Sequence, residues 1–408
     1  MTGECEPKTE HTLDVRWLLN PRRQPMRNLR LTFAGSTLVD LRELPAGVEP
    51  EPIAVVPPFV NPHAHLEFTD CTQPVDTGTT FPDWIRGVIS ERQSSTRTNG
   101  RGVLQGLAES AAAGVAVVGD IVTSDPVHGI PDDGPPAVVG FREFIGLNPD
   151  NIDEAIRIAR THLTIGSRPD NASCCTAGLS PHAPYSVHPD LCAALCEQAA
   201  EYGAPAATHL AESPAEMELV NSGTGPFREF LRELGLWNPS LFPAPTVLAR
   251  SISLLATARR GLVIHGNFLG PAELRQVAES TQLSLVYCPR THHYFGHPQH
   301  PWRQVLEAGG RVVLGTDGKV SNPDLSIWRE LQFIARKALD MSAAELLPMI
   351  TTDAADAVGR NPDAFELRAG TQSPGVVLDC RASSAQTAEE LLRDPTVQPA
   401  GWTTDLVD

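Results

Sequence analysis

The sequence predicts an α/β protein whose main part is a (β/α)8, or TIM-like, barrel, and three observations support this fold class. Eight short runs of β-branched and small residues recur along the chain, separated by segments that can form helices. Strands that alternate with helices indicate βα units and a parallel sheet. The runs are almost continuously apolar, as expected for strands covered on both faces. Eight such units in about 290 residues fit a barrel with insertions.

The predicted strands cover residues 53–60, 115–121, 137–141, 174–179, 204–209, 262–265, 283–287 and 312–315. The predicted helices between them cover residues 81–92, 101–113, 151–162, 189–201, 215–234 and 271–279. A doubly wound open sheet is the alternative arrangement of such units. It is less favoured because no glycine-rich phosphate turn follows the first strand.

Both ends of the chain lie outside the predicted barrel. Residues 1–56 contain strand-like runs at 29–33 and 37–41, and residues 360–408 contain one at 375–379. Neither end is long enough to bury a core alone. We therefore predict that 1–56 and 360–408 pair into a small β-rich domain beside a barrel domain of residues 57–359. The stretch 44–52, rich in Gly, Pro and Glu, is the expected first boundary.

Composition excludes several classes of protein. The chain has no apolar run of about 18 residues, so no membrane span is expected. Its N-terminus lacks the apolar region of a secretory signal, so we expect a cytoplasmic location. A net charge of −17 argues against nucleic acid or an anionic membrane as partner and leaves a small-molecule substrate. Eight scattered cysteines without a CxxC pair are expected to be reduced and not to bind metal.

Polar residues stand at or just after the carboxyl ends of the predicted strands. His63 and His65 follow the first strand, His209 and His265 end the fifth and sixth, and Asp317 follows the eighth. The carboxyl ends of barrel strands form the face on which active sites are built. Imidazole nitrogens and carboxylate oxygens are ligands of divalent zinc-like ions. The set therefore predicts one catalytic metal site, which indicates an enzyme.

Six motifs, in this order, resemble those of the amidohydrolase superfamily. They are Pro62-His-Ala-His-Leu-Glu67, Ser180-Pro-His-Ala-Pro-Tyr185, Thr208-His-Leu-Ala-Glu212, Val263-Ile-His-Gly266, Cys288-Pro-Arg290 and Leu314-Gly-Thr-Asp317. Within the superfamily they are similar to the cytosine-, guanine- and adenosine-type aminohydrolases and the related chlorohydrolases. The last two motifs and the residues after them resemble members that deaminate adenine-containing metabolites such as aminodeoxyfutalosine.

The resemblance implies a role for each matching residue. The ligands of a single divalent metal would be His63, His65, His209 and Asp317. Zinc is the expected metal, with iron or nickel as alternatives. Glu212 would shuttle protons, while His265 and Asp317 would hold the attacking water in line. His182 would contact the substrate, and a homodimer is expected at the level of the family.

Five further residues are candidates for substrate contact by their position alone. Glu67 lies two residues beyond His65 and would bind a substrate amino group or orient a ligand histidine. Trp84 and Arg86 follow the first strand and would either cover the pocket or pack their own helix. His293 and His297 belong to a histidine-rich loop, residues 291–300, whose role is equally open to a structural interpretation.

The scarcity of lysine separates the branches of the superfamily. Only Lys8, Lys319 and Lys337 occur in the chain, so the fourth strand offers no lysine that could be carboxylated to bridge two metals. This favours one metal and the deaminase branch, with a pair bridged by glutamate or cysteine as the alternative.

The expected reaction makes the chain a hydrolase of carbon–nitrogen bonds other than peptide bonds. A metal-activated hydroxide would attack an amino-substituted purine, pyrimidine or nucleoside, and ammonia would leave. Chloride loss or cyclic amide opening at the same site is the alternative. A barrel that binds metal or ligand without turnover is the non-enzyme alternative.

Overall fold

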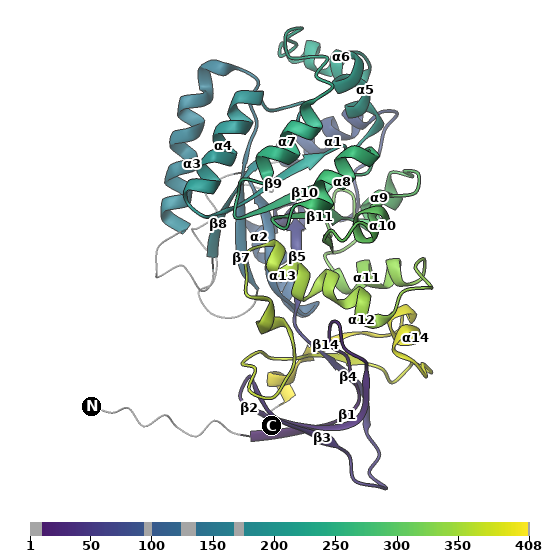
Figure 1. Cartoon of the computed structure of the whole chain (residues 1–408). Coiled ribbons are helices and arrows are strands. Elements are labelled where there is room, and N and C mark those ends of the chain that lie inside the picture. Colours follow the sequence, from purple (N-terminus) through teal and green to yellow (C-terminus); the bar gives the residue numbers. More distant parts are fainter. Residues whose placement is uncertain (1–9, 94–99, 124–135, 167–174, 407–408) are drawn as a thin grey trace, which may run out of the picture.

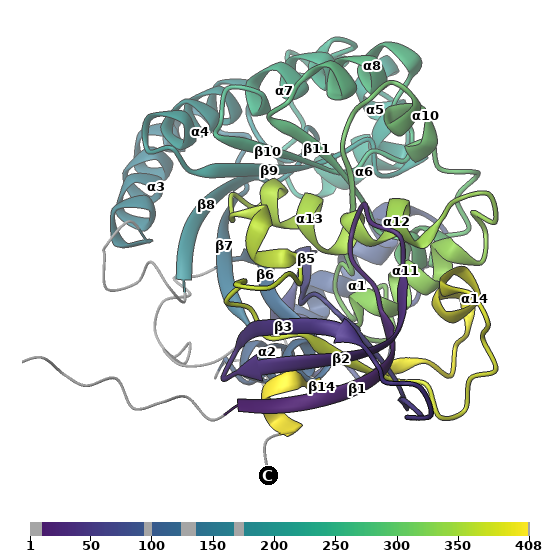
Figure 2. The ribbon, with the colours of Figure 1, turned by 60° about the horizontal axis from the view of Figure 1, so that its bottom comes forward.

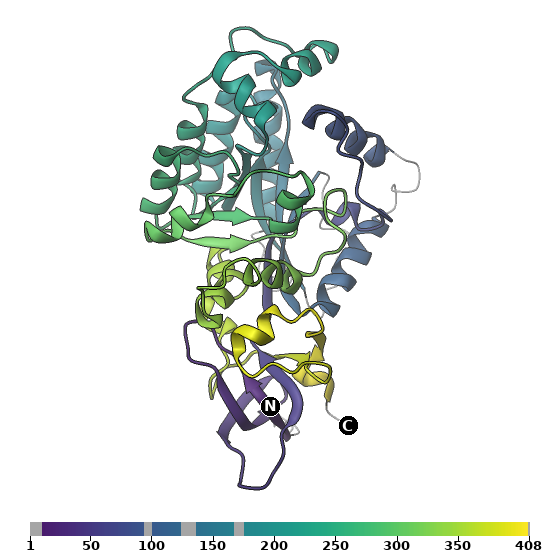
Figure 3. The same cartoon turned by 90° about the vertical axis from the view of Figure 1, so that its right-hand side faces the viewer.

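The structure, a computed structural model, describes residues 10–93, 100–123, 136–166 and 175–406. Figure 1 shows a large α/β part above a small sheet that contains both ends of the described chain. Seen from the side, these two parts are stacked along the long axis of the molecule (Figure 3). This arrangement confirms the predicted barrel with a small β-rich domain built from the two ends of the chain.

The large part is a sheet of eight parallel strands in sequential order. They are β5 (Phe59–Ala64), β6 (Val115–Val122), β7 (Ala137–Phe144), β8 (Cys175–Pro181), β9 (Pro205–Leu210), β10 (Arg260–His265), β11 (Leu283–Tyr287) and β12 (Val312–Leu314). The first and last strands meet, because Ala64 forms a parallel bridge with Asp317. The amides of Thr316 and Asp317 both donate to the carbonyl oxygen of His63, each at 3.1 Å. These contacts close the sheet into a barrel.

Helices follow the strands and cover the outside of the barrel. The principal helices are α1 (Phe81–Gln93), α2 (Arg101–Ala112), α3 (Ile152–Gly166), α4 (Pro189–Glu201), α5 (Pro214–Ser222), α6 (Pro226–Glu233), α7 (Val247–Leu255), α8 (Pro271–Glu279), α9 (Pro289–Tyr294), α10 (Trp302–Glu307) and α11 (Ile327–Ala335). The single helix predicted over residues 215–234 is wrong: it is the pair α5 and α6. Gly223 and Gly225 break it with φ angles of 68° and 87°.

The predicted first strand, residues 53–60, is also two strands. Its first half belongs to β4 (Glu51–Val56) in the small sheet, and its second half opens β5 in the barrel. Pro57 and Pro58 separate them, because two consecutive residues without an N–H group cannot donate to a neighbouring strand. Strand β5 also extends four residues beyond the predicted end at Val60, so His63 lies inside it rather than after it.

The small sheet joins segments from both ends of the chain. Its strand order is β14-β13-β4-β1-β2-β3, with β1 (Glu10–Leu18), β2 (Met26–Ala34), β3 (Thr37–Glu43), β13 (Val376–Asp379) and β14 (Gln398–Trp402). Strand β13 pairs with β4 in antiparallel register, which ties the C-terminal part to the N-terminal part. The division of the chain at residues 56/57 and 359/360 stays a prediction. In the part that the structure describes, no helix is long and apolar enough to cross a membrane.

The amino ends of the barrel strands are closed by α13 (Thr352–Ala357), which Figure 2 shows across the barrel. Ala354 and Ala355 of this helix pack against the apolar side chains inside the barrel. Asp356 pairs with Arg260 and Arg311 at the amino ends of β10 and β12. Among the described residues, α13 therefore fills the amino end of the barrel, and the described cavity opens at the carboxyl ends of the strands.

Trp328 of α11 joins the barrel to the C-terminal segment, and its loss is expected to destabilise both. The side chain is fully buried, stacks on Phe59 with ring centroids 5.6 Å apart, and donates from Nε1 to the Val397 carbonyl at 2.9 Å. Trp328→Ala should lower the free energy of unfolding in urea by about 3–5 kcal/mol. Tyr202→Ala, at an exposed helix end, is the control. A change below about 1 kcal/mol for Trp328→Ala would contradict this packing role.

Candidate active site

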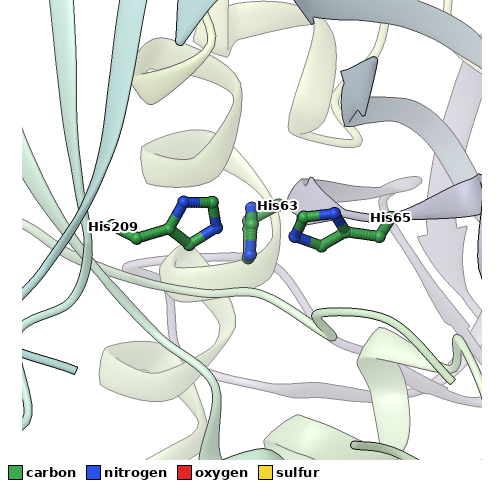
Figure 4. Close-up of side chains that lie close together, drawn as sticks. All are labelled: His63, His65 and His209. Carbon is green, nitrogen blue, oxygen red and sulfur yellow. The ribbon is translucent and has the colours of Figure 1, made fainter. Parts of the chain in front are cut away.

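Four strand ends bring a cluster of imidazoles and one carboxylate together at the open end of the barrel. The donor atoms of His63, His65 and His209 lie within 4.8 Å of one another, and so do those of His63, His265 and Asp317. Figure 4 shows the ring of His63 between the rings of His65 and His209. The structure thus unites all the residues that were predicted from the strand ends as one site.

Three of these histidines carry ring nitrogens that no protein atom satisfies, among them Nε2 of His265. His63 is completely buried, yet both its Nδ1 and Nε2 have no hydrogen-bond partner, and Nδ1 of His65 is in the same condition. Buried polar atoms without a partner are rare because they cost free energy. Asp317 Oδ1 lies 3.5 Å from the Nε2 atoms of both histidines. A divalent metal would take up one nitrogen of each histidine together with Oδ1 of Asp317, so the donor set fits such an ion.

Neighbouring groups orient two of the donors toward the cluster. Nδ1 of His209 lies 3.3 Å from the carbonyl oxygen of His182. Because a carbonyl oxygen only accepts hydrogen bonds, the ring hydrogen sits on Nδ1, and the lone pair of Nε2 is available to a metal. Ser321 donates from Oγ to Oδ2 of Asp317 at 2.8 Å, which leaves Oδ1 toward the histidines.

Burial keeps the imidazoles of His65, His209 and His265 neutral, as metal binding requires. It lowers the pKa of His65 and His209 well below the ordinary value, and that of His265 to about 3. Burial raises the pKa of Asp317, but the adjacent imidazoles of His63, His65 and His265 lower it by more. The pKa of Asp317 therefore lies below its ordinary value. The neutral imidazoles of His65, His209 and His265 therefore stand beside the ionised carboxylate of Asp317.

Glu212 lies beside this cluster with its carboxyl group toward His265. Its Oε1 is 3.3 Å from Nε2 of His265, and the side chain is buried. Burial, and then the negative charges of Asp317 and Glu216, raise the pKa of Glu212 well above its ordinary value. A carboxyl group with a raised pKa exchanges protons at a pH closer to neutral, as general acid–base catalysis requires.

The backbone is strained at three of these strand ends. Ala211, His265 and Asp317 have φ angles of 52°, 66° and 59°, in the left-handed region that residues with a Cβ rarely adopt. Each such conformation costs about 1–3 kcal/mol and typically persists where the surrounding structure enforces it. Ala211 follows β9, His265 ends β10 and Asp317 follows β12, so all three strained residues lie at the cluster.

A cavity of about 380 Å³ extends from the cluster to the surface. Its inner end is lined by His65, His209, His265 and Asp317 of the cluster and by Glu212, His182 and Glu143, whereas His63 is not among the lining residues. Its outer part is apolar and comes from α1, from α6 with the residues after it, and from the loop after β7: Trp84, Ile85, Val88, Ile89, Ile145, Leu147, Phe230, Leu231, Leu234 and Leu236. Ile145 and Leu234 at its mouth are 58% and 51% exposed. Such an apolar surface indicates a binding site.

Glu143 and Arg92 line the cavity, and the sequence analysis missed both. Glu143 lies at the carboxyl end of β7, where the rule that found the other site residues also applies. Its Oε1 is 3.9 Å from Nε2 of His182. Ser186 donates from Oγ to the Ala183 carbonyl, so it accepts from Nδ1–H of His182 at 2.6 Å and leaves Nε2 as an acceptor. Two acceptors thus face each other, and a substrate donor group would join them.

The other predicted substrate contacts divide into two groups. Trp84 lines the cavity, and Glu67 pairs at 2.8 Å with Arg92, which also lines it. Arg86, His293 and His297 are not among the residues that line the cavity. Their contacts with substrate stay predictions.

The histidine-rich loop instead contacts the site through its last member. His300 donates from Nε2 to the carbonyl oxygen of His265 at 2.8 Å, while its Nδ1 accepts from the Trp302 amide at 3.0 Å. The ring of His300 stacks on Tyr287 with centroids 3.9 Å apart. His300 therefore holds the strained backbone of His265 from outside the cavity.

The barrel and its histidine–aspartate cluster define the class of protein to which the chain belongs. A model of the amidohydrolase family matches residues 54–396. The chain therefore belongs to the amidohydrolase family, which confirms the resemblance seen in the six sequence motifs.

Two curated relatives show which members of the family are similar. The aminodeoxyfutalosine deaminase of Deinococcus radiodurans is 29% identical over 326 residues, covering 72% of this chain and 70% of the relative. The 5-methylthioadenosine/S-adenosylhomocysteine deaminase of Pyrococcus furiosus is 25% identical over 347 residues, covering 80% and 73%. Both are deaminases of adenine-containing compounds by name.

Solved structures share the fold over nearly the whole chain. The Helicobacter pylori aminofutalosine deaminase in complex with methylthio-coformycin has a TM-score of 0.76 at 20% identity and covers 93% of this chain and 94% of its own. The atrazine chlorohydrolase of Arthrobacter aurescens, complexed with zinc, has a TM-score of 0.73 at 17% identity and covers 95% and 92%. These likenesses establish the fold.

Proposed function

We propose that the chain is a metal-dependent hydrolytic deaminase that releases ammonia from an adenine nucleoside carrying an apolar substituent. The observation that carries the proposal is that Glu212 and His265 line the inner end of one cavity together with His65 and Asp317, beside the buried His63. The names of the two curated relatives support an adenine-type substrate.

In this proposal His63, His65, His209 and Asp317 hold one metal ion, for which zinc is the first choice. The choice of zinc is supported by the nitrogen and oxygen donor set and by the zinc reported for the solved chlorohydrolase. When bound, such an ion activates water as a nucleophile near neutral pH and polarises the site as a Lewis acid.

Glu212 carries the protons of the reaction. It accepts a proton from the attacking water and passes it to the ring nitrogen next to the amino-bearing carbon. A carbon–oxygen bond forms at that carbon, the carbon–nitrogen bond to the amino group breaks, and the amino group leaves as ammonia with the second water proton. His265 is neutral and 3.3 Å from Glu212, so it can orient the water without competing for the proton.

The cavity supports an orientation for the substrate. The amino-bearing ring belongs at the inner end, beside Glu212, and the rest of the molecule extends toward the mouth. Glu143 and His182 would accept hydrogen bonds from substrate donor groups such as hydroxyls. The apolar side chains of the outer part, among them Trp84 and Phe230, fit a substituent without charge.

Phosphorylated substrates are expected to react poorly. Arg92 is the one cationic side chain among the described cavity-lining residues, and Glu67 already pairs with it at 2.8 Å. Glu143 and Glu212 would repel a phosphate. The kcat/KM for AMP should be at least about 100-fold below that for 5′-methylthioadenosine, measured as ammonia release. Equal or higher values for AMP would contradict the proposed substrate class.

A panel of substrates tests the proposal against the other reactions of the same site. Zinc-loaded protein is incubated with 5′-methylthioadenosine, aminodeoxyfutalosine, adenosine, cytosine, guanine and a chlorotriazine, and both ammonia and chloride are measured. Ammonia from the adenine nucleosides is expected. Chloride from the triazine alone would favour the alternative, for which the shared chlorohydrolase fold is the supporting observation. No product from any compound, with zinc bound, would contradict the deaminase proposal.

A cytoplasmic location and a homodimer stay predictions at this stage. Cell fractionation tests the first, and analytical ultracentrifugation of the zinc-loaded protein tests the second.

A further inference from the structure

We infer that Glu216 is a positioning residue that holds the proton-carrying Glu212 in place. Glu216 lies in the first turn of α5, three residues after the N-cap residue Ser213, and its side chain is fully buried. It is not among the residues that line the cavity, so it acts only through its neighbours. The inference rests on the proposed role of Glu212 as the proton carrier.

The carboxylate of Glu216 binds two successive peptide groups of the turn that follows β9. Its Oε1 accepts from the amide of Ala211 at 2.9 Å, and its Oε2 accepts from the amide of Glu212 itself at 2.8 Å. Two hydrogen bonds to a charged acceptor fix the orientation of both peptide planes. They therefore set the direction in which the side chain of Glu212 leaves the backbone.

The other side of the same turn is held by the residues that follow β10. Asn267 donates from Nδ2 to the carbonyl oxygen of Glu212 at 2.8 Å, and the Phe268 amide donates to the Ala211 carbonyl at 3.0 Å. Ala211 needs this support because its φ of 52° is a strained conformation. Without Glu216 only the carbonyl side of the turn would remain fixed, and the turn could relax.

Helix capping alone does not explain Glu216. Glu345 is a capping residue at the same position of α12, and it accepts from the amide of its own N-cap residue, Ser342, at 2.9 Å. Glu345 is exposed, whereas Glu216 is buried and reaches the two residues that precede its N-cap. Within the described chain no ion pair includes Glu216, and burial raises its pKa to about 7. An unpaired buried carboxylate is costly, so a cap is an insufficient reason to keep it.

Glu216→Gln tests the inference with little change in shape. A glutamine offers one acceptor oxygen and places an NH2 group against one of the two amide donors. We expect kcat to fall about 10- to 100-fold, because a small displacement of a catalytic group has effects of this size. KM should stay within about threefold and zinc content should match wild type, since neither the cavity lining nor the metal ligands change.

Glu345→Gln is the matched control, because it removes the same group from a helix N-terminus far from the cavity. It should leave kcat unchanged. A second readout needs no activity: amide hydrogen exchange of residues 210–213 should rise in Glu216→Gln and not in Glu345→Gln. This readout also distinguishes a local effect from incomplete folding. Incomplete folding would speed exchange in all peptides, whereas the inference predicts faster exchange at residues 210–213 alone.

Three outcomes separate the inference from the proposed function. An active wild type with an unchanged kcat per zinc-loaded, folded Glu216→Gln chain would overturn the inference alone. A lower kcat per folded chain without faster exchange at residues 210–213 would also overturn it, because the turn that carries Glu212 would then not depend on Glu216. An inactive wild type with faster exchange at residues 210–213 would overturn the deaminase proposal while the positioning of Glu212 stands.

Discussion

Glu212→Gln is expected to abolish ammonia release. The substitution keeps the size of the side chain but removes the carboxyl group, 3.3 Å from His265, that is proposed to take a proton from water and return it to the substrate. General acid–base catalysis contributes about 10²–10⁴-fold, and this residue acts in more than one proton transfer, so kcat should fall by about 10³-fold or more. Steady-state ammonia assays measure the loss.

The same variant should still bind metal and substrate, since Glu212 is proposed neither as a metal ligand nor as the main substrate contact. Zinc content per chain and binding of 5′-methylthioadenosine are measured beside kcat. Glu218→Gln, exposed on α5, the helix that follows Glu212, serves as the control and should retain full activity. A Glu212→Gln enzyme with more than about a tenth of the wild-type kcat would rule out this proton carrier.

Removal of the metal is expected to have the second largest effect. A chelator should eliminate activity and lower the melting temperature, because an ion that binds only the folded chain stabilises it by RT ln(1 + [L]/Kd). That term is about 2.7 kcal/mol at 100 times Kd. Without the ion, the buried Nε2 of His63 has no hydrogen-bond partner. Zinc added back should restore both properties, and unchanged activity after complete metal removal would contradict the proposal.

His63→Asn tests whether the metal binds at the proposed site or elsewhere on the protein. The variant should hold less than about a tenth of the wild-type metal and show no activity, because His63 belongs to two of the three groups of donor atoms found among the described residues. His11→Asn, in the small sheet, is the matched control and should keep its metal. A fully loaded His63→Asn protein would show that the ion binds elsewhere.

The sequence analysis predicted the barrel and the cluster for the same physical reason. Parallel strands with helices between them place their carboxyl ends together, so His63, His209, His265 and Asp317 could be joined before any coordinates were known. The break at Pro57 and Pro58 was missed because apolar residues continue on both sides of it. Hydrophobic pattern alone does not tell which sheet a strand joins.

Residues that depend on long-range geometry could not be found in this way. Arg92 enters the cavity only because α1 folds back over the barrel, and Glu216 matters only because its side chain turns toward Glu212. Glu143 is different, since the strand-end rule would have found it had the strand been extended beyond Phe141. For residues 291–300 the sequence shows where the histidines lie along the chain. It does not show which of their rings point toward the cavity and which point away from it.

The most direct test of the account is deamination of 5′-methylthioadenosine by the zinc-loaded protein in water enriched in oxygen-18. The account predicts that the product gains one heavy oxygen at the carbon that lost its amino group, with one ammonia released per product, and that Glu212→Gln forms neither. Mass spectrometry reads the label, and an ammonia assay gives the ratio. A product without solvent oxygen, or turnover without ammonia, would contradict hydrolytic deamination at this site.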